Sequence, residues 1–302
     1  MTKFFRKIKP VICFILCILI CLSVIIIVSI NDKSGMAEED RFVLKIWQID
    51  SFEGGKGSRA DYLQKIGEEY SSKSSTYFSV ISISADSARR NIEEGNVPDI
   101  ISYGAGFYGL ESYIKEYTCW CYGAYCLLSL ESGADFSDCS KDNTIVNMGK
   151  DNRADVAAMF LDLQDAQFEK PTTAYVKLIN GKYKYLLGTQ RDVFRLKSRG
   201  VSFNLKPITE FNDLYQNISV LSSGKRGEEG KSFVNFLTSQ SAGIKDLGLF
   251  ASGKKLHDTE LKNLEGLSYN YKITSPISKK TKEKIDGAVG ANDINMLKNL
   301  MK

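Results

Sequence analysis

Residues 95–106, GNVPDIISYGAG, decide how the rest of the chain is interpreted. They follow a charged helical pattern over residues 87–94, which cannot continue through Pro98 because the ring fixes φ and removes a backbone donor. Residues 99–101 predict a short buried strand, and residues 102–106 predict a flexible polar loop at its carboxyl end. Ligands of open α/β sheets sit at this end of the strands, where small residues let them approach the backbone. The stretch is therefore either one wall of a ligand site or a strand–loop junction without a ligand.

The segments before this stretch favour the ligand site. Strands are predicted over residues 42–49 and 77–84, with a helix over residues 59–70 between them. Together with the strand above they give the order βαβαβ, which right-handed crossovers fold into a parallel sheet with helices on both faces. The glycine-rich loop 50–58 and the loop 102–106 then lie on the same edge of that sheet.

Helical and strand patterns continue to alternate toward the C-terminus. Residues 153–163 predict a helix by propensity, and residues 174–187 predict either a hairpin around Asn180-Gly181 or a helix followed by a strand. The remaining predicted elements are helices at 110–117, 231–237, 281–285 and 293–301, and strands at 119–129, 202–207 and 214–221.

The first thirty residues predict a membrane anchor. Four basic residues, Lys3, Arg6, Lys7 and Lys9, precede residues 11–30, a run that contains serines but no charge. Twenty helical residues span roughly the 30 Å hydrocarbon core of a bilayer. The basic flank predicts a cytoplasmic N-terminus (1–10), a transmembrane helix (11–30), an extracellular spacer (31–41) and an extracellular remainder.

The alternatives to an uncleaved anchor are lipid modification and cleavage. Lipid modification is disfavoured, because Cys17 and Cys21 follow the large residues Leu16 and Ile20 instead of a small one. Cleavage after the small-x-small pattern at residues 35–37 remains open, although the apolar run is long for a signal peptide.

The charge balance argues against a nucleic-acid partner. The chain has 40 Lys and Arg residues, and removing the four of the N-terminal flank leaves 36, equal to its 36 Asp and Glu residues. The part after the anchor is therefore neutral and has no concentrated basic face.

The cysteines and the single histidine give no metal or cofactor site. Four cysteines follow the anchor: Cys119, Cys121, Cys126 and Cys139. They are consistent with small buried thiols or a disulfide whose pairing stays open. The only histidine, His257, lies in a charged stretch that predicts a solvated surface, far in sequence from these cysteines.

A second polar loop follows the predicted strand at 183–187. Thr189 as N-cap and Asp192 three residues later resemble a capping box for the next helix. Gln190 and Arg191 between them either serve that helix start or point into a cleft, and both roles are compatible. The Arg191 guanidinium suits carboxylates or vicinal hydroxyls.

Four short motifs resemble extracellular solute-binding proteins of ATP-binding-cassette importers, in particular their carbohydrate-type branch. The similarity covers residues of about 42 to 250. The motifs are Gly95-x-x-Pro98-Asp99-Ile100, Trp120-x-x-Gly123-x-Tyr125, Lys182-Tyr183-x-Tyr185-x-Leu187-Gly188 and Phe233-x-x-Phe236-Leu237-x-Ser239-Gln240.

This resemblance implies a two-lobed α/β fold of the periplasmic-binding-protein type, with a ligand cleft that closes by hinge motion. The first lobe would comprise residues 42–118 and about 215–302, and the second lobe residues 119–214. The implied partners are a small solute, a sugar by preference, and the importer's permease subunits. The implied solute contacts are Asp50, Phe52, Glu53, Tyr103, Trp120, Tyr122, Gln190 and Arg191, with core packing as the alternative role for Tyr103, Trp120 and Tyr122.

Enzymatic activity is not expected. A glycosidase needs two carboxylates about 5–10 Å apart, and Asp50, Glu53 and Asp192 would be the candidates. Nucleophilic catalysis would depend on His257, and the sequence has no G-x-S-x-G or phosphate-binding loop. A membrane-tethered sensor with the same fold is the other alternative.

Overall fold

The computed structural model describes residues 42–301 except Gly55 and Lys150, and the fold below is that of the unit Val43–Lys302. The predicted anchor at 11–30 lies outside the described residues. Among the helices that are described, none is long and apolar enough to cross a membrane.

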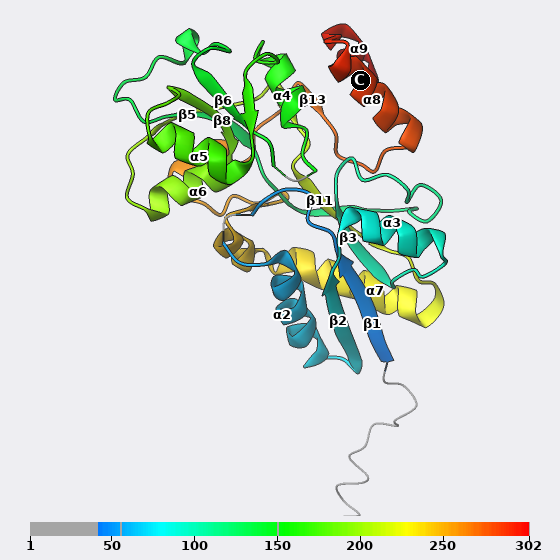
Figure 1. Cartoon of the computed structure of the whole chain (residues 1–302). Coiled ribbons are helices and arrows are strands. Elements are labelled where there is room, and N and C mark those ends of the chain that lie inside the picture. Colours follow the sequence, from blue (N-terminus) through cyan, green and yellow to red (C-terminus); the bar gives the residue numbers. More distant parts are fainter. Residues whose placement is uncertain (1–41, 55, 150, 302) are drawn as a thin grey trace, which may run out of the picture. The chain divides into compact units, whose positions relative to one another are not determined.

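A six-stranded mixed sheet forms what we call the first lobe (Figure 1). Strands β1 and β3 are parallel, with Gln48 opposite Ser102. Strand β11 runs antiparallel between β3 and β4, so the sheet as a whole is mixed, although β1 and β3 of the predicted βαβαβ unit are parallel as expected. In sheet order the strands are β12 (Phe250–Ala251), β4 (Thr118–Tyr122), β11 (Tyr215–Val220), β3 (Ile100–Gly104), β1 (Phe42–Gln48) and β2 (Thr76–Ser82).

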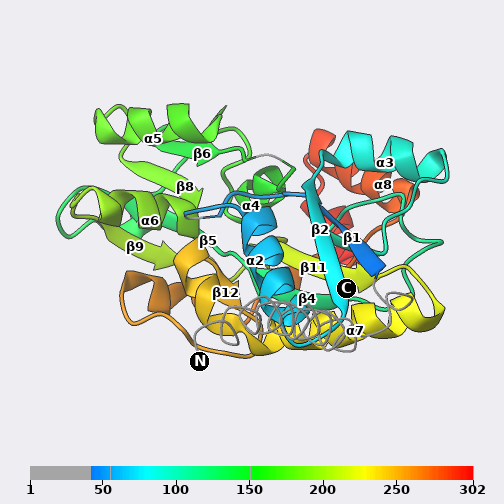
Figure 2. The same ribbon diagram turned by 90° about the horizontal axis from the view of Figure 1, so that it is seen from below.

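Helices cover both faces of this sheet (Figure 2). On one face, α3 (Ala85–Glu93) buries Ala88 and Ile92 in a cluster with Trp47. On the other face lie α2 (Arg59–Ser71), capped by the Ser58 hydroxyl, and α7 (Gly224–Ser239).

A five-stranded sheet and its helices form the second lobe. Strand β6 is parallel to β7 and β8, whereas β5 is antiparallel to β8 and β9. Residues 174–187 adopt the predicted helix followed by a strand. In sheet order the strands are β7 (Gln167–Glu169), β6 (Thr144–Asn147), β8 (Tyr185–Thr189), β5 (Tyr125–Ser129) and β9 (Asn204–Pro207); the helices are α4 (Ala154–Phe160), α5 (Pro171–Ile179) and α6 (Gln190–Ser198), and a 3-10 turn η2 covers Phe136–Asp138.

Two crossovers join the sheets and bond to each other. Gly123 lies in the first, between β4 and β5, and the second runs through β10 (Phe211–Asn212) into β11. The Asn212 amide donates to the Gly123 carbonyl at 3.0 Å, and the Gly123 N–H donates to the Leu214 carbonyl at 2.6 Å. This pairing makes the two crossovers one connection between the lobes.

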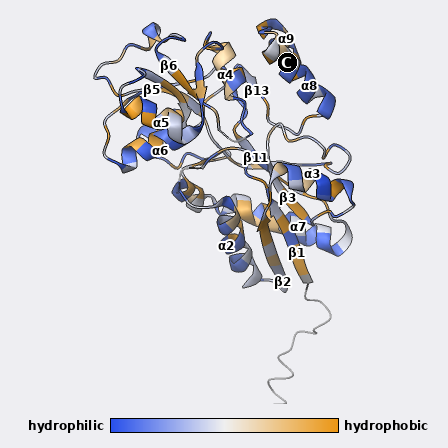
Figure 3. Cartoon of the chain, in the orientation of Figure 1, coloured by the Kyte–Doolittle hydropathy of each residue, from blue (hydrophilic) through white to orange (hydrophobic). Residues whose placement is uncertain are grey.

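The C-terminal segment bonds to the first lobe at residues 240–247 and 274–277, and other parts of it pack on the second lobe. Leu261 and Leu264 enter the core cluster of its sheet, and Asp286 of α8 pairs with Arg153 beside α4. Figure 3 shows hydrophobic orange stretches in the strands of both sheets, whereas α8 is mainly hydrophilic blue. The elements of this segment are η3 (Ser241–Leu247), η4 (Glu260–Leu264), β13 (Tyr271–Lys272), α8 (Lys279–Gly290) and α9 (Ile294–Leu300).

The helix predicted over residues 110–117 is wrong, because these residues form turns. Their one fully buried side chain is Leu110, and the tyrosines that follow are exposed, so no apolar stripe supports a helix there.

Candidate functional site

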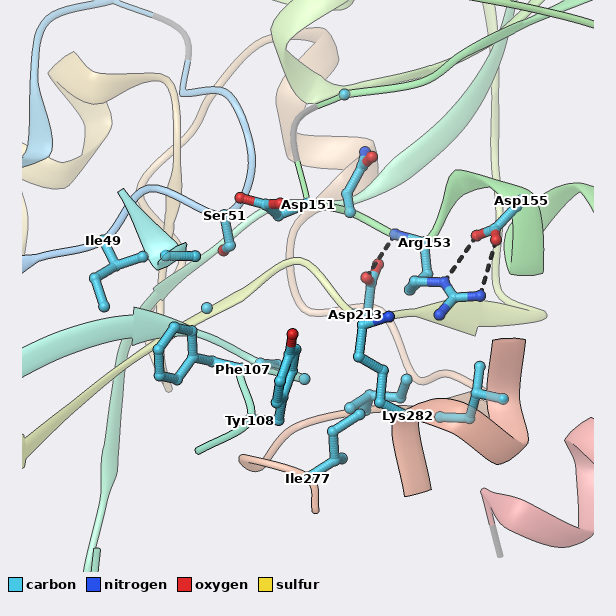
Figure 4. A pocket seen from close by; sticks show the side chains of 18 of the residues that line it. Ile49, Ser51, Phe107, Tyr108, Asp151, Arg153, Asp155, Asp213, Ile277 and Lys282 are labelled. Carbon is cyan, nitrogen blue, oxygen red and sulfur yellow. Dashed lines mark hydrogen bonds and ion pairs between the residues drawn. The ribbon is translucent and has the colours of Figure 1, made fainter. Parts of the chain in front are cut away.

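A cavity of about 360 Å³ lies between the carboxyl edge of the first sheet and the loop before α4 (Figure 4). Ser51, just after β1, and Phe107, just after β3, line it from the first lobe. Arg153 lines it from the second lobe, Asp213 from the return crossover and Lys282 from α8. Both lobes therefore contribute to one site. Residues near the start and near the end of the described chain meet there.

The parallel pairing of β1 and β3 brings the two first-lobe loops together, as the sequence predicts. Their contact is so close that only glycine fits at position 104. A Cβ there would lie 1.7 Å from the Ser51 hydroxyl oxygen. Gly106 has a φ of +78°, a conformation that L side chains rarely adopt. The end of the stretch 95–106 is thus one wall of the cavity.

Aromatic rings and cations form the lower wall in Figure 4. The Arg89 guanidinium lies over the rings of Phe107 and Tyr108, 5.4 and 4.3 Å from their centroids. Lys282 lies 5.7 Å from the Tyr108 ring centroid. Arg89 is also paired with Asp86 on its own helix. Cation–π contacts thus hold the Tyr108 ring in place.

Arg153 is held by two carboxylates. Its Nε and Nη2 donate to the two oxygens of Asp155 at 2.9 and 2.8 Å, and its Nη1 donates to Asp286 at 2.6 Å. Burial alone would lower the pKa of Arg153, but these carboxylates raise it above its usual value. Lys282 pairs with the other Asp286 oxygen at 2.5 Å. Burial would raise the pKa of Asp286, yet Lys282 and Arg153 hold it below its usual value.

Asp213 is a buried carboxylate in the return crossover that also lines the cavity. It accepts hydrogen bonds from the Tyr125 hydroxyl and from the Arg153 backbone N–H, both at 2.8 Å. Burial raises its pKa to about 6, although both donors favour the ionised form. Burial and the Asp213 carboxylate together raise the pKa of Tyr125 well above its usual value.

The eight residues predicted to contact solute divide into two groups. Asp50, Phe52, Glu53 and Arg191 line a separate cavity of about 220 Å³, at the start of α2. The Arg59 side chain organises this cavity by pairing with Asp50 at 2.8 Å and stacking 4.5 Å from the Phe52 ring centroid.

Gln190 and Arg191 bind the first-lobe loop directly. Arg191 pairs with Glu53 at 2.8 Å and donates to the Gly54 carbonyl at 2.9 Å. The Gln190 side chain donates to the Glu53 carbonyl and accepts from the Ala124 N–H, each at 3.0 Å. These residues therefore tie the second lobe to the first lobe and to the crossover.

Tyr103, Trp120 and Tyr122 lie in the core. Tyr103 has no exposed surface and bonds to the Ser219 hydroxyl at 3.0 Å. The Trp120 indole stacks on Tyr62 and donates to Ser102, and the Tyr122 hydroxyl accepts from the Gly266 N–H. Their positions favour the packing alternative that the sequence left open.

The residues considered for catalysis have other roles. His257 is buried, contrary to the sequence prediction, and bonds to the Leu249 carbonyl at 2.9 Å. The charged residues around it face outward while the imidazole packs on Phe250. Asp192 is buried in the predicted capping box, where it accepts from Thr189 N–H and from Asn147. Burial raises the pKa of Asp192.

The four cysteines of the described chain are free thiols. Burial raises the pKa of Cys119 to about 12 and that of Cys121 and Cys126 well above their usual value. Within residues 42–301, excluding Gly55 and Lys150, no group of three or more His, Cys, Asp or Glu side chains is placed to hold a metal ion.

Arg153, Asp155, Asp213 and Lys282 carry no signal that marks them in the sequence. Arg153 and Asp155 stand at the start of a predicted helix, where an acidic residue is usual and does not indicate a function. Lys282 is one of several lysines in α8, and only the fold shows which of them faces the cavity.

Known structures share this fold. No protein-family model and no curated protein sequence matches the chain. The ferric binding protein from Campylobacter jejuni is 13% identical, with a TM-score of 0.51 over 85% of this chain and 99% of that protein. The periplasmic binding protein AfuA from Actinobacillus pleuropneumoniae, with fructose-6-phosphate bound, is 13% identical, with a TM-score of 0.52 over 83% and 98%.

A two-component system protein that mediates signal transduction is also similar, with 13% identity and a TM-score of 0.51 over 74% of this chain and 93% of that protein. At such identities the likeness shows the fold alone. The chain has the two-lobed α/β fold of periplasmic binding proteins, as the sequence resemblance implied.

Proposed function

We propose that the chain is the solute-binding protein of an ATP-binding-cassette importer and captures a small polar solute, by preference a carbohydrate. The observation that carries the proposal is the 360 Å³ cavity bounded by both lobes. Its volume falls within the roughly 300–1,000 Å³ range of small-molecule sites. Hinge motion at the paired crossovers would open and close it. Likeness to two binding proteins supports this use of the fold.

The cavity lining supports a carbohydrate. The rings of Phe107 and Tyr108 suit the apolar face of a sugar, and the polar groups of Asn152 and Arg153 suit its hydroxyls. The fold is compatible with such a ligand, since the AfuA structure contains a sugar phosphate. The described residues that line the cavity form no metal-ligating group, so we do not propose iron.

The proposed location is the outer face of the cell membrane. The apolar run 11–30, flanked by basic residues, supports an N-terminal anchor with the binding lobes outside the cell. The importer's permease subunits would then be the protein partners. We propose binding and not catalysis, because the carboxylates considered for a glycosidase are paired or buried outside the 360 Å³ cavity.

Ligand-dependent stability of the full-length chain, purified in mild detergent, tests capture. A captured sugar should raise the unfolding temperature in proportion to the logarithm of its concentration above Kd. Chromatography should recover the sugar unchanged. A chemically altered sugar would indicate an enzyme, and the absence of any shift across sugars, peptides and ions would overturn solute capture.

A membrane-tethered sensor is the second candidate, because a two-component signalling protein shares the fold. Uptake of the identified sugar separates the two functions. Deletion of the chain should abolish uptake if it serves an importer. Unchanged uptake with a lost transcriptional response to the sugar would support the sensor.

A further inference from the structure

The cations at the 360 Å³ cavity already have carboxylate partners. Arg89 is paired with Asp86, Arg153 with Asp155 and Asp286, and Lys282 with Asp286. Recognition of a phosphate or another oxyanion relies on guanidinium or ammonium groups that are free to bind it. Here a carboxylate already balances the positive charge of each such group.

Two buried side-chain oxygens at this cavity have no hydrogen-bond partner in the described part of the chain. They are the Ser51 hydroxyl oxygen and the side-chain amide oxygen of Asn152, and neither is bonded to another residue that the structure describes. Asn152 is only 7% exposed. A buried polar group without a partner costs about 1–3 kcal/mol, so a ligand that supplies the missing hydrogen bonds gains that free energy on binding.

Asp151 adds an unpaired negative charge beside these groups. No hydrogen bond or ion pair joins its carboxylate to another residue that the structure describes. Its backbone has a φ of +57°, and Figure 4 shows its side chain extending toward Ser51. A carboxylate accepts hydrogen bonds from hydroxyls and repels phosphate.

Resting on the proposed function, we propose that this cavity selects uncharged polyhydroxylated solutes and rejects their phosphorylated forms, with Ser51, Asp151 and Asn152 as specificity-determining residues. Hydroxyls both donate and accept, so several hydroxyls of one solute can together satisfy the serine, the amide oxygen and the carboxylate. The phosphate dianion of a sugar phosphate offers acceptors only, and its negative charge would be repelled by Asp151. The inferred selectivity thus differs from the ligand seen in AfuA.

Calorimetric titration of the full-length chain with paired probes tests the inference. The probes are fructose, glucose and mannose, each beside its 6-phosphate, together with inorganic phosphate. We expect at least one unphosphorylated sugar to bind about tenfold or more tightly than its phosphate. Tighter binding of a phosphate would overturn the inference but keep solute capture. No binding of any probe would overturn the inference together with the carbohydrate preference, whereas solute capture as such is tested by the wider panel of sugars, peptides and ions.

Matched variants test the named residues. Asp151→Asn should reduce the ratio of the affinity for the sugar to the affinity for its phosphate at least severalfold. Asp162→Asn is the control, because Asp162 has a similar φ of +59° and lies outside the cavity. Ser51→Ala should weaken sugar binding by about tenfold. Ser222→Ala also removes a buried hydroxyl without a partner, but outside the cavity, so it should leave sugar binding unchanged. Equal effects of test and control variants would overturn the assignment.

Discussion

At the scale of single residues, the contact of Gly104 with Ser51 shows most directly how the sequence shapes the site. An alanine Cβ at position 104 would overlap the serine side chain, so Gly104→Ala must displace the loop after β1. We expect a loss of about 1–3 kcal/mol of unfolding free energy and weaker solute binding. Urea unfolding and calorimetry measure the two effects.

The control for this substitution lies in α8. A Cβ at Gly287 would meet no atom within 4 Å, and the backbone there is helical, so Gly287→Ala should stabilise the protein by up to about 1 kcal/mol. If Gly104→Ala were as stable as wild type with unchanged affinity, the close contact would have no structural role.

Asp213 gives a prediction for pH dependence. Its folded pKa of about 6 exceeds the ordinary value of 3.8, so the folded state binds the proton more tightly than the unfolded state. Its ionisation therefore destabilises the fold above pH 6, and this cost, about 3 kcal/mol, disappears as the pH falls from 6 toward 4.

Urea unfolding of wild type and Asp213→Asn at pH 7.5 and pH 5 measures this contribution. Relative to the variant, wild type should be more stable at pH 5 than at pH 7.5. Carboxylates with a lowered pKa, such as Asp286, destabilise both proteins in acid by the same amount. Their contribution therefore cancels in the comparison. A difference between the proteins that does not vary with pH would contradict the buried ionisation.

The aromatic residues show what the sequence could not predict at this scale. The strand predicted over residues 99–101 continues to Gly104, because β11 pairs with it from more than 100 residues away. Tyr103 therefore lies inside the sheet opposite Asn217 instead of in the loop beyond it. Local patterns carry no information about such a distant strand, whereas they did indicate the glycine-rich wall after it.

At the scale of elements, Asp99 joins β3 to β1 and α7. Its carboxylate accepts from the Lys45 N–H at 2.8 Å and from Arg226 Nε at 2.8 Å. Burial would raise the pKa of Asp99, but Arg226 and the Lys45 backbone hold it below its usual value. The Pro98-Asp99 pair, predicted from its helix-ending pattern, thus also anchors the strand that leads to the cavity.

Asp99→Asn should lower the unfolding free energy by about 1–2 kcal/mol at pH 7, because a charged acceptor of these bonds is lost. The difference from wild type should shrink as the pH falls through the lowered pKa, where wild type also loses the charge. Asp258→Asn removes an exposed pair with Lys245 and should cost little. Equal costs for the two variants in chemical unfolding would contradict this role of Asp99.

The elements themselves were predicted well where periodicity or capping residues were strong. The alternating run at 42–49, the helix after Ser58 and the capping box at Thr189 all appear in the structure. The direction of β11 and the packing of parts of the C-terminal segment on the second lobe depend on contacts between distant segments. Sequence spacing does not encode these contacts.

At the scale of the whole molecule, Arg191 and Gln190 connect the second lobe to the loop 50–58. Because these bonds exist only when the lobes are close, Arg191→Ala should favour the open form and increase the dissociation rate of the solute severalfold. Stopped-flow measurement of dissociation checks this. Arg199→Ala, which removes a cation from the Tyr175 ring after the same helix, should leave the rate unchanged.

Solute capture in the cavity between the lobes is tested most directly by a crystal structure of the full-length chain with the tightest-binding sugar. We expect density for the sugar between Ser51, Phe107 and Arg153, with hydroxyls bonded to Asp151 and Asn152. Density instead in the cavity of Asp50, Glu53 and Arg191, or elsewhere on the protein, would contradict binding in the 360 Å³ cavity.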